Sequence, residues 1–490
     1  MISTFLLLCV VTLILYAFFS TVKPKKFPPG PVWYPFIGSS GILQRMTKKY
    51  GSEWRAFLEL SRQYSTNVLG MKTSTELLVV VSGEKNVRQV FYDKDFDARP
   101  NNFFARLRCL GNQNMGITFA NGEMWKIHRQ FAVKNLKHVG YGKTLMETEI
   151  QNELSRLLNY LKENNSKPIN VVNILSESVV NVLWKYVAGE RIQEEKLKHL
   201  LDLFRQRGKA FSVAGGMLNQ IPWCRYIIPK LSGYSLITKL NREISNVIEE
   251  AIEKHKNNEV KEKDFIYLFL EEINANRDPT FTEEQLKIVC LDFLIAGSQT
   301  SSNLLGFAFL KALKCQETQQ KICEEIDTVI GDRLPCWNDS DRLIYTSAFL
   351  QEVHRYYPIV PMAGPRLLLN DTSIDGYIIP KGATVVMSVG DIYFDPELWD
   401  DPHVFKPERF IDESGMLKTS EHMYTFGLGR RRCPGDSLAK SFIFITFVGI
   451  LQKYRIHVSN GTIPSDVPSI GILSSPRPYT AEFILRRNDN

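Results

Sequence analysis

The chain has 490 residues, of which 44% are hydrophobic and 23% charged, a composition that supports a large folded core and excludes global disorder. Lys and Arg total 60 against 53 Asp and Glu, so the formal net charge is +7. This modest excess suits an anionic membrane surface or an acidic protein partner. The basic residues form no dense stripe interleaved with aromatics, which excludes nucleic acid as an expected partner.

The first segment of the chain, residues 2–19, is uncharged and is interrupted only by Ser3, Thr4 and Thr12. As a helix it would be roughly 27 Å long, close to the thickness of a bilayer's hydrocarbon core. Lysines follow it, and neither a basic start nor a cleavage site is evident. We predict a single-pass membrane anchor over residues 1–22, with residues 23–490 as the cytoplasmic body. A cleaved signal peptide is the alternative.

After a proline-rich linker at residues 28–31, helical periodicity dominates the chain. In chain order, helices are expected over 122–136, 144–164, 171–188, 282–314, 345–356 and 437–452, with a further helix ending at Gly331. Thr282 and Gln285 form a capping-box pair at the start of the longest helix. Strands are expected over 77–81, 373–379 and 383–389, and a loop over 221–234. This pattern predicts a single, mainly α domain with small β-sheets (α+β).

The cysteines are scattered, with no C-x-x-C pair, no C-x-x-C-H haem-attachment motif and no zinc spacing. A disulfide framework is therefore not expected, and the body is predicted to lie in a reducing compartment. Cys433 differs from the other cysteines in its surroundings, because it lies in the glycine- and arginine-rich run F-G-L-G-R-R-R-C-P-G at residues 426–435. Glycines there let a loop approach a flat cofactor closely, and arginines favour a thiolate. A lone cysteine is more often buried and inert, but these neighbours favour ligation.

This run resembles the F-x-x-G-x-R-x-C-x-G motif of the cytochrome P-450 family at every fixed position. The resemblance implies the fold of that family and a noncovalently bound haem b whose iron is ligated by the Cys433 thiolate. Within the motif, it also implies that the haem is contacted by Phe426, Gly429 and Arg431.

Further motifs of the family follow in the expected order. A W-x-x-x-R motif and two other basic positions imply contacts to the haem propionates from Trp125, Arg129, Arg99 and Arg366. An E-x-x-R motif and a later P-E-R-F element imply a buried ionic network of Glu352, Arg355 and Arg409. Taken alone, an E-x-x-R pair is more often a surface ion pair, and Arg99 alone is equally well a surface charge.

The helix on the oxygen side of the haem departs from the family pattern. Residues 296–300 read A-G-S-Q-T, so Gln299 stands where the family usually has an acid, while Thr300 is retained. A carboxylate can relay protons, whereas an amide only orders water by hydrogen bonds. By resemblance, Thr300 and Gln299 are the candidate catalytic residues.

Substrate identity is less constrained by the sequence. The recognition segments of the family correspond here to Thr118, Phe119, Ala296, Val360 and Leu473. These small, apolar or aromatic side chains suit a lipophilic compound. The stretches at 26–31 and 96–100 resemble an insect subgroup that includes methyl farnesoate epoxidase. Two substrate classes stay open: a sesquiterpenoid ester epoxidised at an alkene, and a small aromatic metabolite hydroxylated at carbon or nitrogen.

The resemblance implies an enzyme that inserts one oxygen atom from O₂, using electrons from NADPH–cytochrome P-450 reductase, at the endoplasmic reticulum membrane. It also admits cytochrome b5 as a second electron donor. The basic residues Arg430, Arg432 and Lys440 are candidates for steering an acidic partner to the cysteine loop. Two alternatives stay open: a haem-thiolate isomerase or dehydratase that works without O₂, which Gln299 motivates, and a non-enzymatic haem sensor.

Overall fold

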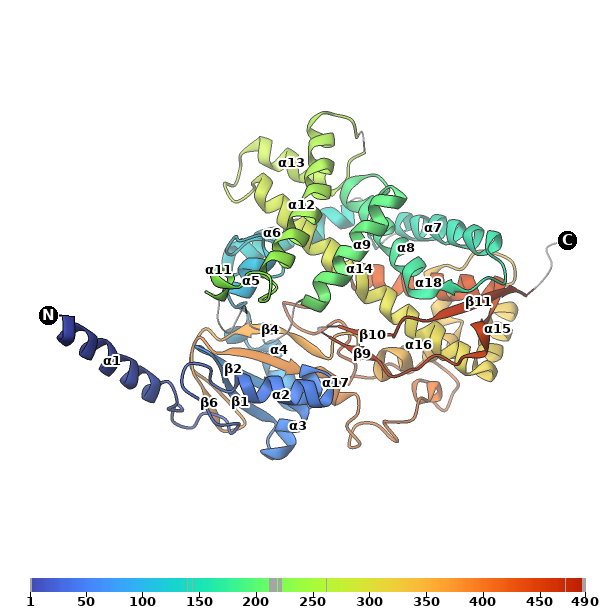
Figure 1. Cartoon of the computed structure of the whole chain (residues 1–490). Helices are drawn as coiled ribbons and strands as arrows, with labels where there is room; N and C mark the ends of the chain where they lie inside the picture. The colour runs from blue at the N-terminus through green and yellow to red at the C-terminus, as the bar shows by residue number, and fades with distance from the viewer. Residues whose placement is uncertain are drawn as a thin grey trace.

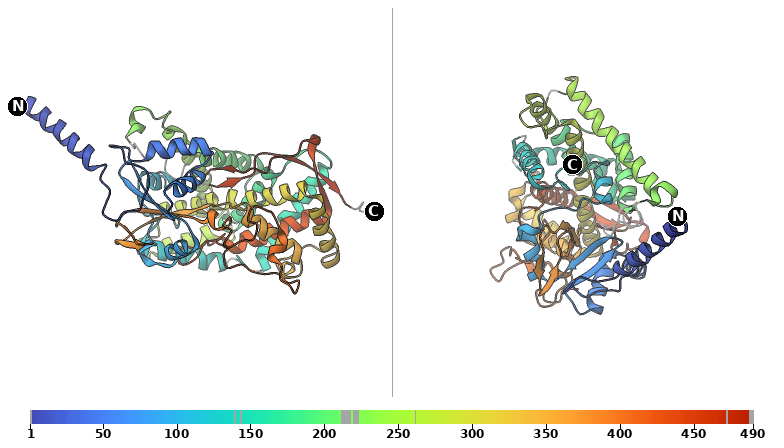
Figure 2. Two further views of the ribbon diagram at one scale, coloured as in Figure 1. Left: turned by 90° about the horizontal axis from the view of Figure 1, so that it is seen from below. Right: turned by 90° about the vertical axis from the view of Figure 1, so that its left-hand side faces the viewer.

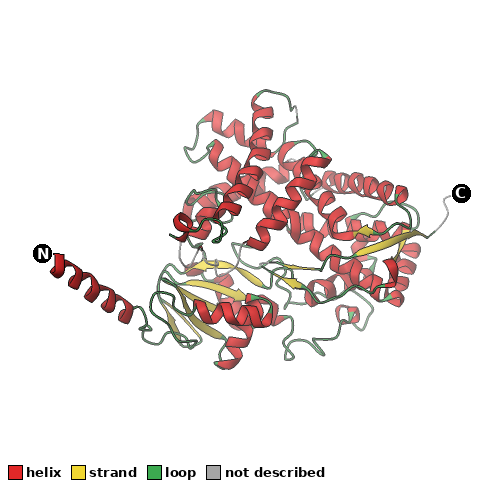
Figure 3. Ribbon diagram, viewed as in Figure 1, coloured by secondary structure: helices red, strands yellow, loops and turns green. Residues whose placement is uncertain are grey.

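The computed structural model describes residues 2–138, 140–142, 144–210, 218, 223–260, 262–471 and 473–486. Helices make up most of the body, and the strands gather into small sheets, as Figures 1 and 3 show. The expected mainly α architecture with small β-sheets is therefore confirmed.

The N-terminal helix α1 (Ile2–Phe19) projects away from the body, as Figures 1 and 2 show. Its large apolar side chains are mostly exposed. Its Tyr16 ring contacts Phe36, with the ring centroids 5.5 Å apart. Within the part of the chain that the structure describes, no helix has both the length and the apolar character of a membrane span. The anchor over residues 1–22 stays a prediction.

The largest sheet has four strands in the order β1 (Val68–Thr73), β2 (Glu76–Val81), β7 (Thr384–Ser388) and β4 (Met362–Leu367). Strands β2 and β7 are parallel, and the outer pairs are antiparallel. Alternate residues of β2 point to opposite faces. Leu78 and Val80 pack with α3 (Glu53–Gln63), while Val79 and Val81 pack with α4 (Glu84–Tyr92). Helices cover both faces of the strand, which explains why its residues 77–81 are all apolar.

The long helix α14 (Glu283–Lys314) forms the centre of the helical body, and α8 (Val171–Ala188) packs along it. Half of the predicted capping box is present, because the Thr282 side chain accepts a hydrogen bond from the Gln285 amide at 3.1 Å. The Gln285 side chain is hydrogen-bonded to the backbone of Gly116 instead of the Thr282 amide. A Cβ at Gly297 would lie only 2.5 Å from a Leu183 methyl group, so any larger residue there would force the Leu183 side chain of α8 to shift. The other principal helices are α2 (Ser40–Tyr50), α5 (Phe103–Arg108), α6 (Gly122–His138), α7 (Thr144–Glu163), α9 (Glu194–Ala210), α12 (Tyr234–Lys256), α13 (Phe265–Ala275), α15 (Gln316–Val329), α16 (Ile344–Tyr356) and α18 (Asp436–Lys453).

Smaller sheets complete the fold: β3 (Ile169–Asn170), β11 (Thr480–Leu485) and β8 (Tyr454–Val458) form one, and β9 (Ser469–Ile470) pairs with β10 (Ser474–Ser475). The single strand expected over 373–379 is wrong. It is a hairpin of β5 (Thr372–Ile374) and β6 (Tyr377–Ile379), because Asp375 and Gly376 both adopt positive φ, 50° and 79°, in a two-residue turn.

Two other boundaries differ from the expectation. The strand expected over 383–389 ends at Ser388, and the short helix α17 (Val389–Ile392) follows it. The stretch expected as a loop over 221–234 contains the short helix α11 (Cys224–Ile227), while residues 221–222 lie outside the described part. Short 3₁₀ turns occur at η1 (Lys94–Phe96), η2 (Trp337–Asp341), η3 (Pro407–Phe410) and η4 (Ser459–Gly461).

Candidate active site

Cys433 lies in a tight loop directly before α18. Gly427 and Gly429 have φ of 68° and 67°, and a Cβ at Gly429 would lie 2.3 Å from the carbonyl oxygen of Phe91. The loop closes through a 2.8 Å hydrogen bond from the Cys433 amide to the Phe426 carbonyl. Glycine is therefore required by the backbone at two positions of the motif.

The sulfur of Cys433 is subject to opposing electrostatic effects. Burial raises the pKa of the thiol, while the amide of Gly435, which donates to Sγ at 3.3 Å, lowers it. Asp436 raises the pKa further, and the charges of Arg129 and Arg432 oppose that effect. A metal ion coordinated by such a thiol removes its proton outright.

Four arginines converge beside this loop: Arg99, Arg129 on α6, Arg366 on β4, and Arg431 two residues before the cysteine. Burial and then the charges of Arg366, Arg431 and Arg129 hold the pKa of Arg99 well below its usual value. Burial lowers the pKa of Arg366 to about 10 and that of Arg431 to about 9. Arginine stays charged in proteins, so burying these four positive charges close together is unfavourable unless an anion binds beside them.

Several N–H groups of this cluster are buried and have no acceptor among the described residues. They are Arg99 Nε, Arg366 Nε, Arg431 Nη1 and Trp125 Nε1. The Arg431 guanidinium lies 3.9 Å from the centroid of the Trp125 ring, which stacks it in place. Buried donors without acceptors carry a desolvation cost that an anionic ligand would remove.

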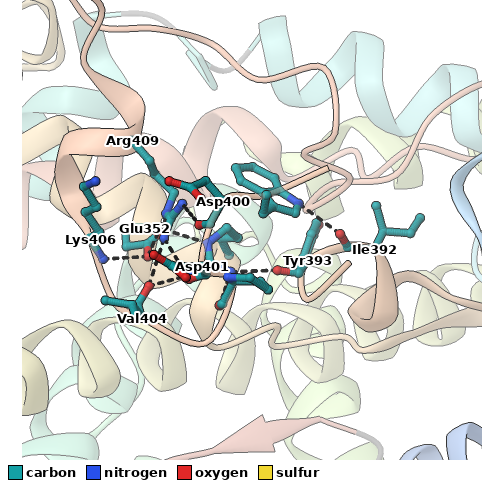
Figure 4. Close-up of polar contacts among 11 residues, drawn as sticks. Glu352, Ile392, Tyr393, Asp400, Asp401, Val404, Lys406 and Arg409 are labelled. Atoms are coloured by element: carbon teal, nitrogen blue, oxygen red, sulfur yellow. Dashed lines mark hydrogen bonds and ion pairs between the residues drawn. The ribbon is translucent and has the colours of Figure 1, made fainter. Parts of the chain in front are cut away.

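The E-x-x-R pair is fully buried, so the surface alternative is wrong. Glu352 and Arg355 on α16 have 0% exposed side chains and form two hydrogen bonds of 2.7 Å. Figure 4 shows Glu352 beside Lys406 and Arg409, which both donate to its carboxylate. Arg409 in η3 lies 3.1 Å from the same carboxylate. The guanidinium of Arg355 also donates to the carbonyl oxygens of Tyr393 and Pro402 at 2.7 and 2.8 Å. The three predicted residues thus join α16 to the stretch 393–409.

On α14, the hydroxyl of Thr300 donates to the carbonyl oxygen of Ala296 at 3.0 Å. This bond orients the hydroxyl and leaves its lone pairs able to accept a hydrogen bond from a water molecule or ligand. The side chains of Gln299 and Thr300 are both half-buried, and Ala296 is exposed.

Comparison with known proteins decides which family these features belong to, because the profile of the family described as Cytochrome P-450 matches residues 28–483. The chain belongs to the cytochrome P-450 family. It is 37% identical to a probable cytochrome P-450 305a1 of Drosophila melanogaster, over 99% of this chain and 100% of the relative. It is 32% identical to a farnesoate epoxidase of Bombyx mori, over 98% and 99%. It is 31% identical to cytochrome P-450 2B15 of Rattus norvegicus, over 95% of each.

Members of this family are haem monooxygenases, so the chain is a cytochrome P-450 monooxygenase that uses haem b with a cysteine thiolate as iron ligand. The residues present fit this group. Haem b carries two propionates, and the arginine cluster offers the unpaired buried donors that two carboxylates need. Cys433, next to that cluster, would hold the iron, while Arg99, Trp125, Arg129, Arg366 and Arg431 would hold the propionate edge.

The predicted substrate residues lie on four segments of the chain, and hydrogen bonds join three of them, or their neighbours, to α14 or to each other. Thr118 is bound through its amide to Asp292 of α14 at 2.9 Å, and Phe119 is buried beneath the guanidinium of Arg108. On the other side, the Ser474 carbonyl accepts from Asn303 of α14 at 3.1 Å, and the Ser474 amide donates to Ile359 at 2.8 Å. These bonds fix the neighbours of Leu473 and Val360. That the five predicted side chains line one pocket stays a prediction.

Asp292 was not predicted as a functional residue, although it joins the pocket segment 116–118 to α14. Its buried carboxylate accepts the amides of Ile117 and Thr118 at 2.8 and 2.9 Å and pairs with Arg108. Gly116 approaches so closely that a Cβ there would lie 2.5 Å from the carboxylate. The available signal was an acid at position 292 inside an otherwise apolar stretch of the helix, 288–296.

Asn121 was also missed. It sits just before α6 and exchanges two hydrogen bonds with the backbone of Arg99, at 2.6 and 3.0 Å. The adjacent Ala120 carbonyl accepts from Arg431 at 2.8 Å. This residue therefore connects the two arginines, and only the folded chain reveals the connection because the partners are far apart in sequence.

Proposed function

We propose that this protein is a reductase-dependent monooxygenase that oxidises a small lipophilic substrate, with Cys433 as the axial haem ligand. The observation that carries the proposal is the cysteine loop beside a cluster of buried arginine donors that lack acceptors. When bound, haem supplies O₂ binding and O–O cleavage, which a thiolate ligand promotes by donating electron density.

The residues of the chain have separate tasks in this proposal. The arginine cluster and Trp125 would bind and orient the propionate edge, and the Glu352–Arg355–Arg409 network holds the stretch 393–409 against α16. The Thr300 hydroxyl accepts and passes a proton on the oxygen side, and Gln299 orders the water behind it. The apolar residues Phe119, Ala296 and Leu473 orient the substrate and exclude water.

Epoxidation of an alkene in a sesquiterpenoid ester is the reaction we favour. It is supported by the relative named farnesoate epoxidase, which matches nearly the whole chain at 32% identity. Hydroxylation of a small aromatic metabolite is the second candidate, and it is motivated by Gln299 in place of the usual acid.

We further propose NADPH–cytochrome P-450 reductase as electron donor, with cytochrome b5 as a second donor. The side chains of Arg430 and Arg432 beside the cysteine loop are 44% and 62% exposed, which leaves them accessible to an acidic partner even though they pair with Asp97 and Asp436. Residues 1–22 would anchor the protein in the endoplasmic reticulum membrane by a single pass, with the body in the cytoplasm. This placement is supported by the uncharged run and the lysines that follow it.

The test is turnover of the purified protein with its reductase and methyl farnesoate or farnesoic acid under ¹⁸O₂, with H₂¹⁸O as the matched control. The proposal expects product that depends on NADPH and carries one ¹⁸O atom from O₂ and none from water. Product that forms without NADPH or O₂ would instead establish the isomerase or dehydratase alternative. Absence of turnover of these and a broad substrate panel with a competent reductase would favour the haem sensor.

A further inference from the structure

Tyr141 lies in the connection between α6 and α7 and is not used in the site described above. Its side chain is buried, and its ring packs edge-on against Tyr186 with the centroids 6.2 Å apart. Its hydroxyl donates to the carbonyl oxygen of Pro434 at 3.4 Å. Tyr141 is therefore joined to the residue that follows Cys433.

The acceptor of Tyr141 and the donor to the sulfur belong to the same peptide group. The carbonyl of Pro434 and the N–H of Gly435 share one planar, resonance-stabilised unit. The carbonyl accepts from Tyr141, and the N–H donates to Cys433 Sγ at 3.3 Å. A Cβ at Gly435 would lie 3.6 Å from the Tyr141 hydroxyl and 3.7 Å from the sulfur, so both flank this peptide.

Hydrogen bonds in series polarise one another. A donor at the carbonyl draws electron density towards the oxygen and leaves the N–H more positive, so the N–H donates more strongly to sulfur. Hydrogen bonds to a ligating sulfur lower the charge that it passes to the metal and favour the reduced state. Because the 3.4 Å contact is long for an O–H···O bond, the effect is expected to be modest.

We propose that Tyr141 is a positioning residue that acts through the Pro434–Gly435 peptide to weaken electron donation from the Cys433 thiolate and so raise the reduction potential of the haem. The inference rests on the proposed ligation by Cys433. A residue outside the ten-residue motif would then adjust the reduction potential of the haem in this protein.

The experiment measures the ferric–ferrous midpoint potential and the ferrous–CO absorption maximum of the haem-loaded protein. Tyr141→Phe keeps the ring and removes the hydroxyl, so its potential should fall by a two- to fivefold change in the reduction equilibrium, or about 20 to 40 mV at about 59 mV per tenfold. Its CO band should shift as well. The matched control is Tyr186→Phe, which removes a buried hydroxyl that has no partner among the described residues and should leave both readouts unchanged.

A second variant keeps the hydroxyl: 3-fluorotyrosine placed at position 141 is a stronger donor and should raise the potential. If the Tyr141→Phe protein does not incorporate haem, the reduction potential of the 3-fluorotyrosine variant alone tests the inference. Unchanged potentials in the Tyr141 variants, or an equal shift in Tyr186→Phe, would overturn the inference. If the wild type itself lacked the thiolate-type CO band, the ligation by Cys433 would be wrong instead, so the two failures are distinguishable.

Discussion

At the scale of single residues, the buried charges are the most sensitive points of this molecule. Glu352 and Arg355 have no exposed side-chain surface, and each satisfies the other through two short hydrogen bonds. The removal of either partner leaves the other charge buried without compensation, which costs about 3–5 kcal/mol. An exposed pair such as Glu194 and Lys198 contributes little by comparison, since water solvates both charges.

We therefore expect Glu352→Ala and Arg355→Ala each to abolish haem incorporation, because the stretch 393–409 loses its attachment to α16. Haem content per protein, from the Soret absorbance of purified samples, measures this effect. Lys198→Ala is the matched control and should load haem normally. Recovery of fully loaded Arg355→Ala protein would contradict the role of the network.

The Thr300 hydroxyl supports a second prediction. Thr300→Ala removes the group that we propose to pass a proton, so NADPH should still be consumed while more reducing equivalents leave as hydrogen peroxide and less product forms. Positioned proton transfer contributes about 10²–10⁴-fold to rate, so partial loss is measurable. Gln299→Glu restores the carboxylate of the family and should keep or improve the product formed per NADPH. If Thr300→Ala leaves that ratio unchanged, the proton-transfer assignment fails.

Residue identities in the site were predictable where a motif carries them. The E-x-x-R motif predicted Arg355, and the structure buries it against Glu352, which also pairs with Arg409. The haem contact predicted for Arg431 from the cysteine motif stays a prediction. Asp292 and Asn121 were not predictable in this way, because their partners lie 174 and 22 residues away along the chain and come together only by folding. No local pattern marks such contacts.

At the scale of elements, two side chains of α14 hold the segment 116–118: Asp292 accepts the amides of Ile117 and Thr118, and Gln285 is hydrogen-bonded to the backbone of Gly116. Asp292→Asn retains an acceptor but loses the charge that pairs with Arg108, so the segment that carries Thr118 should loosen. We expect a several-fold rise in KM with a smaller change in kcat, because the pocket is affected more than the chemistry. Steady-state kinetics on one substrate measures the changes in KM and in kcat separately. Glu249→Gln, an exposed partner of Lys287 on α14, is the control and should behave as wild type.

The elements themselves were predictable to different degrees. Helices α8 and α14 match their expected ranges closely, because caps and periodicity are local properties that the chain carries in its own sequence. The hairpin of β5 and β6 was misread as one strand, although Asp375-Gly376 is a strong two-residue turn signal. The order of strands in the main sheet was not predictable, since β2 pairs with β7 across 300 residues of chain.

At the scale of the whole molecule, α1 stands outside the body that contains the site. Deletion of residues 1–22 should therefore leave a haem-loaded protein that associates poorly with membranes. Flotation with liposomes and the haem content of the same preparation test both halves of this expectation. Membrane binding equal to that of the full chain would contradict the anchor, and complete loss of haem would show that the segment is needed for folding.

The central claim is that Cys433 ligates the haem iron as a thiolate, and its most direct test is the ferrous–CO difference spectrum of the wild type and of Cys433→Ala. Among the described residues, the next cysteine along the chain is Cys336, which the fold holds at η2 against Asp339 rather than in the loop. We predict that the wild type shows the red-shifted band of thiolate ligation and that Cys433→Ala lacks it. Survival of the red-shifted band in Cys433→Ala would contradict this assignment.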